Sequence, residues 1–183
     1  MVNRMRGGAM RKGDGVLNGA ALLIGLLRYA NLAVALLMVA VLLGTFLFAG
    51  PLSAQLSAKY AGKVAIPQVI GLLRILPLAG LASAWQFHRL LQSLRAMVAS
   101  VRAGDPFVAA NAARLRIVGW SLLMLQIIDL FIGAMIWWAR AHHIDVIDWQ
   151  PSILGWLGVL IAFILARVFA VGTEMRTDLD GTI

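Results

Sequence analysis

Two charged residues, Arg74 and Asp129, interrupt long apolar stretches of the sequence. An ionised aspartate at the centre of a membrane helix costs about 2.5 to 3.5 kcal/mol, while each Val, Ile, Leu or Phe returns only about 0.3 to 0.6 kcal/mol. On helices that enter from the same surface, the two charges lie at depths of about 10 and 14 Å, a difference that an arginine side chain spans. We therefore expect a structural ion pair; the alternatives are an ion, proton or ligand site, or no contact.

Further polar residues recur at helical spacing on the faces that carry these two charges. The polar seam defined in this way consists of Arg74, His88, Gln92, Asn111, Gln126 and Asp129. If the two faces meet, the seam runs discontinuously between the helices. It then serves either to hold the helices together by hydrogen bonds or to line a small ligand cavity or conduction path.

His142, His143, Asp145 and Asp148 are metal-ligating residue types within one short segment. Adjacent histidines in a short loop rarely converge on one ion, so a solvated surface is the preferred interpretation and we predict no metal. His88 is the only histidine within a predicted span, which excludes bis-histidine haem within one chain. We predict no cofactor.

The sequence carries no recognisable catalytic constellation. It shows no nucleophile beside a base, no phosphate-binding glycine loop and no acidic pair at helical spacing. The absence of cysteine excludes disulfides, thiolate metal sites and thiol catalysis. We therefore expect a protein that is not an enzyme.

Composition indicates an integral membrane protein. Hydrophobic residues make up 61% of the chain and charged residues 13%, whereas soluble domains are near one quarter charged. The net charge of +8 fits cytoplasmic segments that set topology and meet anionic lipid. We expect no direct nucleic-acid binding, because no base-reading module accompanies the charge.

The predicted fold is all-α, a four-helix transmembrane bundle within a single membrane domain over residues 17–183. Its spans are placed at about 30–49, 68–88, 118–138 and 152–170. Residues 1–16 are basic and glycine-rich, which predicts a flexible N-terminal arm. Residues 51–67 are expected to form a loop with one turn of surface helix. A signal peptide is the competing interpretation of the first apolar run, but that run is too long and too far from the start.

The second and third helices are predicted to extend beyond the membrane as a cytoplasmic hairpin, residues 89–117. Helical periodicity from Gln68 to Ala103 covers roughly 54 Å, more than a hydrocarbon core of about 30 Å. Gly104 fits a helix C-terminus, Asp105 an N-cap and Pro106 the first position of the next helix.

Charge asymmetry predicts that both termini are cytoplasmic. Three basic residues, Lys59, Lys63 and Arg140, fall on the other side. Eleven fall on the side of the hairpin: Arg4, Arg6, Arg11, Lys12, Arg89, Arg95, Arg102, Arg114, Arg116, Arg167 and Arg176. Because positive loops stay inside, this end faces the cytoplasm.

The hairpin and the C-terminal segment are expected to pack together, with Phe107, Phe169 and Met175 between them. The assembly is either a self-contained cap or a docking face for a cytoplasmic partner. The candidate docking residues are Arg102, Asp105, Phe107, Arg114, Arg116, Arg167, Glu174, Arg176 and Asp178.

Two blocks of sequence resemble a known family. The first is Gly104-Asp105-Pro106-Phe107, Asn111-Ala112, Arg114-Leu115-Arg116 and Gly119-Trp120; the second is Leu165-Ala166-Arg167-Val168-Phe169, Gly172, Met175-Arg176 and Asp178-Leu179-Asp180-Gly181-Thr182-Ile183. In these blocks the chain resembles the bacterial family called domain of unknown function 2975. The resemblance implies a four-helix protein of the bacterial inner membrane, often encoded beside a small Cro-like helix-turn-helix regulator. It implies no established activity and no catalytic residues.

The function predicted from these features is that of a non-enzymatic membrane protein. In this interpretation it senses a membrane or small-molecule signal and sequesters the helix-turn-helix regulator. The alternative is a small transporter or immunity-type protein that uses the Arg74/Asp129 polar seam. The expected partners are the lipid bilayer, the regulator and a second copy of the chain.

Overall fold

Five helices make up the computed structural model, which describes the backbone of residues 2–105 and 108–180 and the side chains of residues 15–105 and 108–175. The helices are α1 (Val2–Leu47), α2 (Ala49–Tyr60), α3 (Ile66–Arg102), α4 (Ala109–Ala141) and α5 (Ile153–Asp180). The described part of the chain contains no strand, so the fold is all-α, as predicted.

Four of these helices are long and apolar enough to cross a membrane. The segments that qualify by length and composition are Gly15–Leu47, Ile66–Arg102, Ala109–Ala141 and Ile153–Met175. Each predicted span lies within one of these longer segments or extends past its bounds by at most two residues. The chain is therefore a multi-pass membrane protein, as composition predicts.

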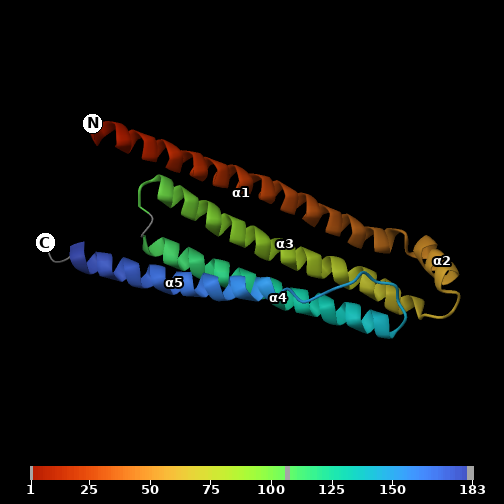
Figure 1. Ribbon diagram of the computed structural model, residues 1–183. Coiled ribbons are helices and arrows are strands. Elements are labelled where there is room, and N and C mark those ends of the chain that lie inside the picture. The colour runs from red at the N-terminus through yellow and green to blue at the C-terminus, as the bar shows by residue number, and fades with distance from the viewer. Residues whose placement is uncertain (1, 106–107, 181–183) are drawn as a thin grey trace.

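The four long helices lie side by side in a single open layer (Figure 1). Their order is α1, α3, α4, α5, and within the described chain α1 makes no packing contact with α5 or α4. The predicted four-helix bundle is thus not closed. Lipid tails are as apolar as leucine, so no hydrophobic force drives the outer helices together.

The α3–α4 turn lies at the same end of the layer as the start of α1 and the end of α5 (Figure 1). Helix α2 and the connection between α4 and α5 lie at the opposite end. We call these the hairpin end and the α2 end. At 1.5 Å per residue, the 37 residues of α3 cover about 56 Å and exceed the hydrocarbon core.

The end of α3 follows the prediction, whereas the start of α4 does not. Gly104 has a φ of 83°, and the amides of Gly104 and Asp105 donate to the carbonyls of Val101 and Ser100, which is the Schellman pattern. Helix α4 begins only at Ala109, with Val108 as its N-cap residue. Asp105 is therefore not the N-cap, because three residues separate it from the helix. The predicted role of Pro106 lies outside the described residues.

Helical backbone reaches further than predicted at three places. It begins at Val2, where a flexible arm over residues 1–16 is predicted. It forms the 12-residue helix α2, most of which falls in the predicted loop, with Pro51 in the first turn, where its missing N–H is tolerated. It also continues through the C-terminal segment to Asp180. Alanine, leucine, methionine, arginine and lysine in these segments favour helix and outweigh the scattered glycines.

Two buried clusters hold the layer together. At the α2 end, Tyr60, Val64, Val69, Leu72, Ala139 and Ile144 join α2, both connections and the ends of α3 and α4. Towards the hairpin end, Ile24, Leu90, Leu91, Val118 and Ala162 come from all four long helices. Beside the second cluster, a small residue allows close approach of α4 and α5, where Gly119 meets the ring of Phe163.

Candidate functional site: the cleft between α1 and α3

The predicted ion pair between Arg74 and Asp129 is absent. Arg74 faces α1, where its Nη2 lies 3.4 Å from the carbonyl oxygen of Thr45 and its guanidinium carbon 4.1 Å from the ring centre of Phe46. Asp129 faces the α4–α5 connection and accepts a hydrogen bond of 3.1 Å from Trp149 Nε1. Equal depth in the membrane does not by itself bring two side chains together. Arg74 on α3 points towards α1, whereas Asp129 on α4 points towards the α4–α5 connection.

The other members of the polar seam also have separate surroundings. His88 Nε2 and Gln92 Nε2 are 2.8 Å apart on α3, at the surface. Neither residue contacts Asn111 or Gln126 through a hydrogen bond in the described structure.

Asn111 and Gln126 are buried, but in two different interfaces. Asn111, which is 1% exposed, donates from Nδ2 to Ser100 Oγ at 2.6 Å and accepts from Arg114 Nη1 at 2.7 Å. Gln126 donates to the carbonyl oxygen of Ser152 at 3.2 Å. The six seam residues therefore do not line one path. His88 and Gln92 contact each other on α3, whereas the other four link neighbouring segments.

A cleft of about 800 Å³ separates α1 from α3 at the hairpin end of the layer. We call it the α1/α3 cleft. Its lining residues are Ala21, Gly25, Arg28, Tyr29, Asn31, Leu32, Ala35, Leu81, Ala84, Trp85, His88, Arg95, Val98, Ala99 and Arg102. A second hollow, of about 330 Å³, lies beside Trp149 and Gly133.

Antiparallel pairing of α1 with α3 positions this lining. Going from the α2 end to the hairpin end, the paired residues are Thr45 with Arg74, Met38 with Gly80, Asn31 with Ala84 and Leu17 with Arg102. Asn31 Nδ2 donates to the carbonyl oxygen of Ala84 at 3.0 Å, and Arg102 Nη2 donates to the carbonyl oxygen of Leu17 at 3.0 Å. These two hydrogen bonds tie α1 to α3 at two levels of the cleft.

Positive charge is concentrated on the cleft wall. Leu81, His88, Arg95 and Arg102 recur every seven residues on one face of α3, about 10.5 Å apart along the axis, and Arg28 faces them from α1. Arg28 Nε is buried and has no hydrogen-bond partner in the described structure. No Asp or Glu lines the cleft. The seven-residue spacing on α3 is visible in the sequence and is a signal for this site. The pairing of α1 with α3 is visible only in the structure.

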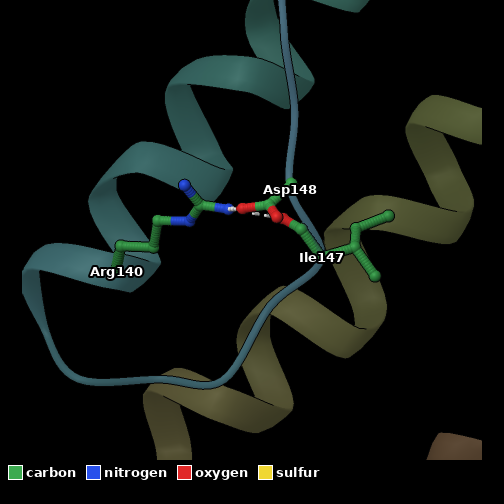
Figure 2. A network of polar contacts seen from close by, with 3 residues as sticks. All are labelled: Arg140, Ile147 and Asp148. Atoms are coloured by element: carbon green, nitrogen blue, oxygen red, sulfur yellow. Dashed lines mark hydrogen bonds and ion pairs between the residues drawn. The ribbon is translucent and has the colours of Figure 1, made fainter.

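The α2 end carries the two ion pairs seen between described side chains. Arg140 pairs with Asp148 and also donates to the carbonyl oxygen of Ile147 at 3.1 Å (Figure 2). Lys59 Nζ lies 3.0 Å from Asp145 Oδ2. The hydrogen bond and the negative charge of Asp145 raise the pKa of Lys59 above its usual 10.5.

These pairs occupy both acids of the conjectured metal site. The neighbouring histidine His142 uses Nδ1 in a 2.8 Å contact with the carbonyl oxygen of Trp138. In the described part of the chain no group of three metal-ligating side chains converges.

The candidate docking residues divide into structural and exposed ones. Arg102 binds α1 through Leu17 and Asn18, with 2.7 Å to Asn18 Oδ1. Arg114 is half-buried and binds Asn111 and, at 3.4 Å, the carbonyl oxygen of Ala96. These two arginines therefore connect helices, whereas Arg116 and Arg167 are exposed.

The remaining predicted docking residues do not all pack together as predicted. Glu174 and Met175 are exposed, so Met175 is not enclosed between the hairpin and the C-terminal helix as predicted. Asp105 is half-buried at the α3–α4 turn, and Phe169 is half-buried on α5. Phe107 and the side chains of Arg176 and Asp178 lie outside the described residues.

A family model described as "Protein of unknown function (DUF2975)" matches residues 54–183, which is well over half of the chain. The match begins within α2 and includes α3, α4 and α5. No curated protein and no solved structure matches the chain. The chain belongs to the DUF2975 family.

Proposed function

We propose that this DUF2975 protein is a non-enzymatic membrane regulator that binds an amphiphilic ligand in the α1/α3 cleft and a cytoplasmic helix-turn-helix regulator at its hairpin end. The observation that carries the proposal is the graded lining of the cleft. Apolar side chains such as Leu32 and Leu81 lie towards one end, and arginines such as Arg95 and Arg102 lie towards the other. This gradient suits a ligand with one apolar and one charged end.

Arg102 supplies a physical connection between the cleft and the hairpin. It lines the cleft, holds Leu17 and Asn18 of α1, and is the last residue of α3, two positions before Gly104. A ligand that binds one arrangement of α1 and α3 better than another shifts the population towards it. Any such shift reaches the α3–α4 turn through this arginine.

The exposed cations at the hairpin end support a docking role. Arg116 projects from the hairpin part of α4, and Arg167 lies on α5. The partner follows from the resemblance to proteins encoded beside a helix-turn-helix regulator. Charge complementarity requires an acidic patch on that partner, and such charges mainly raise the association rate and specificity.

The transporter alternative loses its main support. It depends on Arg74 and Asp129 sharing a path with the rest of the polar seam. Those residues instead bind Thr45 and Trp149 on opposite sides of the layer. No specific observation favours that function over the regulator.

Retention of the adjacent gene product by the full-length protein in native membranes tests the docking step. The variant Arg116→Glu/Arg167→Glu should retain at least tenfold less regulator than the unaltered protein. The matched control is Lys63→Glu, an exposed charge reversal at the α2 end, and it should retain the normal amount. If the unaltered protein retains no regulator, or all three proteins retain the same amount, the docking proposal is wrong.

A cleft-filling substitution tests the coupling step. Gly25 lines the cleft, and an added Cβ there meets no atom within 4 Å, so Gly25→Leu fills space without a clash at its base. We expect retention of the regulator to stop responding to added membrane lipid extract in this variant. Gly71→Leu, also in open surroundings but away from the cleft, is the control. An unchanged response in Gly25→Leu would contradict the coupling.

A further inference from the structure

The unpartnered guanidinium of Arg28 gives the α1/α3 cleft a specific chemistry. Arg28 is half-buried, its Nε is shielded from solvent, and no described oxygen accepts a hydrogen bond from it. A buried donor left without an acceptor destabilises the folded protein, and more so when it is charged. The protein part of the site is therefore incomplete and lacks an acceptor at this position.

Arg74 shows why this feature is informative. Its Nε is also buried without a partner, but its guanidinium rests on the ring of Phe46 and reaches the carbonyl of Thr45. Arg74 does not line the cleft, and its charge is compensated within the protein. Arg28 has no such compensation and opens onto a space of about 800 Å³.

The charged side chains that line the cleft favour an anionic ligand. Three arginines, Arg28, Arg95 and Arg102, line it together with His88, and no carboxylate does. The ion pairs of the described structure, Lys59–Asp145 and Arg140–Asp148, both lie at the α2 end. Arginine forks match the oxygens of phosphate through paired hydrogen bonds. A ligand that also carries an amine is disfavoured, because it would place a further positive charge among these arginines.

The position of the cleft relative to the membrane favours a lipid as that ligand. Its lining includes Tyr29 and Trp85, whose side chains are 77% and 65% exposed. Such aromatic residues favour the level of the lipid headgroups. From that level, Leu32, Ala35 and Leu81 continue the lining towards the hydrocarbon, where an acyl chain belongs.

We propose that the α1/α3 cleft binds an anionic phospholipid, with Arg28 and Arg95 binding its phosphate from the two sides of the cleft and Leu32, Ala35 and Leu81 along an acyl chain. The inference rests on the proposed function only in taking the cleft as the ligand site. It adds the chemical class of the ligand. It also assigns Arg28, which lies outside the segment matched by the family, as a phosphate-binding residue.

Native mass spectrometry of the full-length protein, released from nanodiscs that contain phosphatidylglycerol and phosphatidylcholine in equal amounts, tests this inference. We expect the unaltered protein to retain phosphatidylglycerol at least tenfold over phosphatidylcholine. The cleft variant Arg28→Gln/Arg95→Gln should lose this preference. The matched control Lys63→Gln/Arg89→Gln removes two exposed cations outside the cleft and should keep it.

Three outcomes would overturn the inference. One is equal retention of both lipids by the unaltered protein, and another is an equal loss of preference in the control and the cleft variant. The third is displacement of phosphatidylglycerol by millimolar inorganic phosphate, which would show that the site binds free phosphate rather than a lipid headgroup. Because Arg28→Gln/Arg95→Gln could fail to fold, Arg28→Lys is measured beside it and should keep a reduced preference; full preference in Arg28→Lys would remove the assigned role of the guanidinium.

Failure of this inference is distinguishable from failure of the proposed function. Retention of the helix-turn-helix regulator is measured on the same preparations. Selective lipid retention without regulator binding supports the lipid site and rejects the docking step. Regulator binding that responds to Gly25→Leu without any lipid selectivity keeps the proposed function and rejects the anionic lipid.

Discussion

Asn31 on α1 donates a hydrogen bond from Nδ2 to the main-chain carbonyl oxygen of Ala84 on α3, over 3.0 Å. We predict that Asn31→Ala destabilises the protein by about 1 kcal/mol, the scale of interhelical hydrogen bonds in membranes. Reversible unfolding in mixed micelles measures this change. Ser83→Ala is the control, because Ser83 Oγ donates to Ala79 within its own helix. Equal losses in the two variants would contradict a special role for the Asn31 link.

Gly133 provides the space that Trp149 occupies. A Cβ at Gly133 would lie 2.5 Å from Trp149 Cζ2, so the indole must move and its hydrogen bond to Asp129 breaks. We expect Gly133→Ala to cost about 1 to 3 kcal/mol, as overpacking does. Gly158→Ala, where an added Cβ meets nothing within 4 Å, should cause no loss. Thermal unfolding followed by tryptophan fluorescence compares them, and a tolerated Gly133→Ala would show that Trp149 is not held there.

Arg74 and Asp129 should be energetically independent. Their partners are Thr45 on α1 and Trp149 in the α4–α5 connection, so a double-mutant cycle with Arg74→Met and Asp129→Asn should give a coupling energy within about 0.5 kcal/mol of zero. A cycle with Asp129→Asn and Trp149→Phe should give about 0.5 to 1.5 kcal/mol, because that hydrogen bond is present. Coupling in the first cycle as large as in the second would restore the ion pair and contradict the structure.

The Lys59–Asp145 pair predicts a pH dependence at the α2 end. Asp145 raises the folded-state pKa of Lys59 above 10.5, so the stabilising effect of the pair is fully present below the unfolded-state pKa and is lost as pH rises through the folded-state value. NMR titration should show that Asp145→Asn lowers the pKa of Lys59. Asp148→Asn should leave it unchanged, because Asp148 pairs with Arg140. Both side chains of the Lys59 pair are exposed, so 1 M salt should weaken the effect.

The hairpin end is predicted to face the cytoplasm. The chain has no cysteine, so single-cysteine variants need no background correction. Ala103→Cys at the hairpin end should react with a membrane-impermeant maleimide only after the cells are opened. Ala141→Cys at the α2 end should react in intact cells; both positions are exposed. Labelling in the reverse order would place the arginine-rich end outside and remove the basis for a cytoplasmic partner.

The sequence was sufficient to predict the spans and the end of α3, because both depend on local chemistry. Apolar runs of about 20 residues have few alternatives to membrane helices, and Gly104 takes the positive φ that this turn requires. The start of α4 was less predictable. Asp105 and Pro106 are good starting residues, but the observed helix begins at Ala109 after the extended residue Val108.

The candidate site could not be predicted because it depends on which helix faces which. Periodicity places Arg74 and Asp129 on helix faces, but it gives no rotation of one helix relative to another. Only the pairing of α1 with α3 shows that Arg28 lines the same cleft as Arg95 and Arg102. The spacing of His88, Arg95 and Arg102 was visible in the sequence, but its partner helix was not.

Among the long helices, α1 packs only against α3, and this has a consequence during synthesis. Helix α1 leaves the ribosome before α3, and no other long helix of the layer packs against it until α3 has been translated. During that interval the membrane must hold α1 without its partner in the layer. Any anionic lipid that meets Arg28 at this stage arrives before the opposite wall exists, and α3 then closes over it.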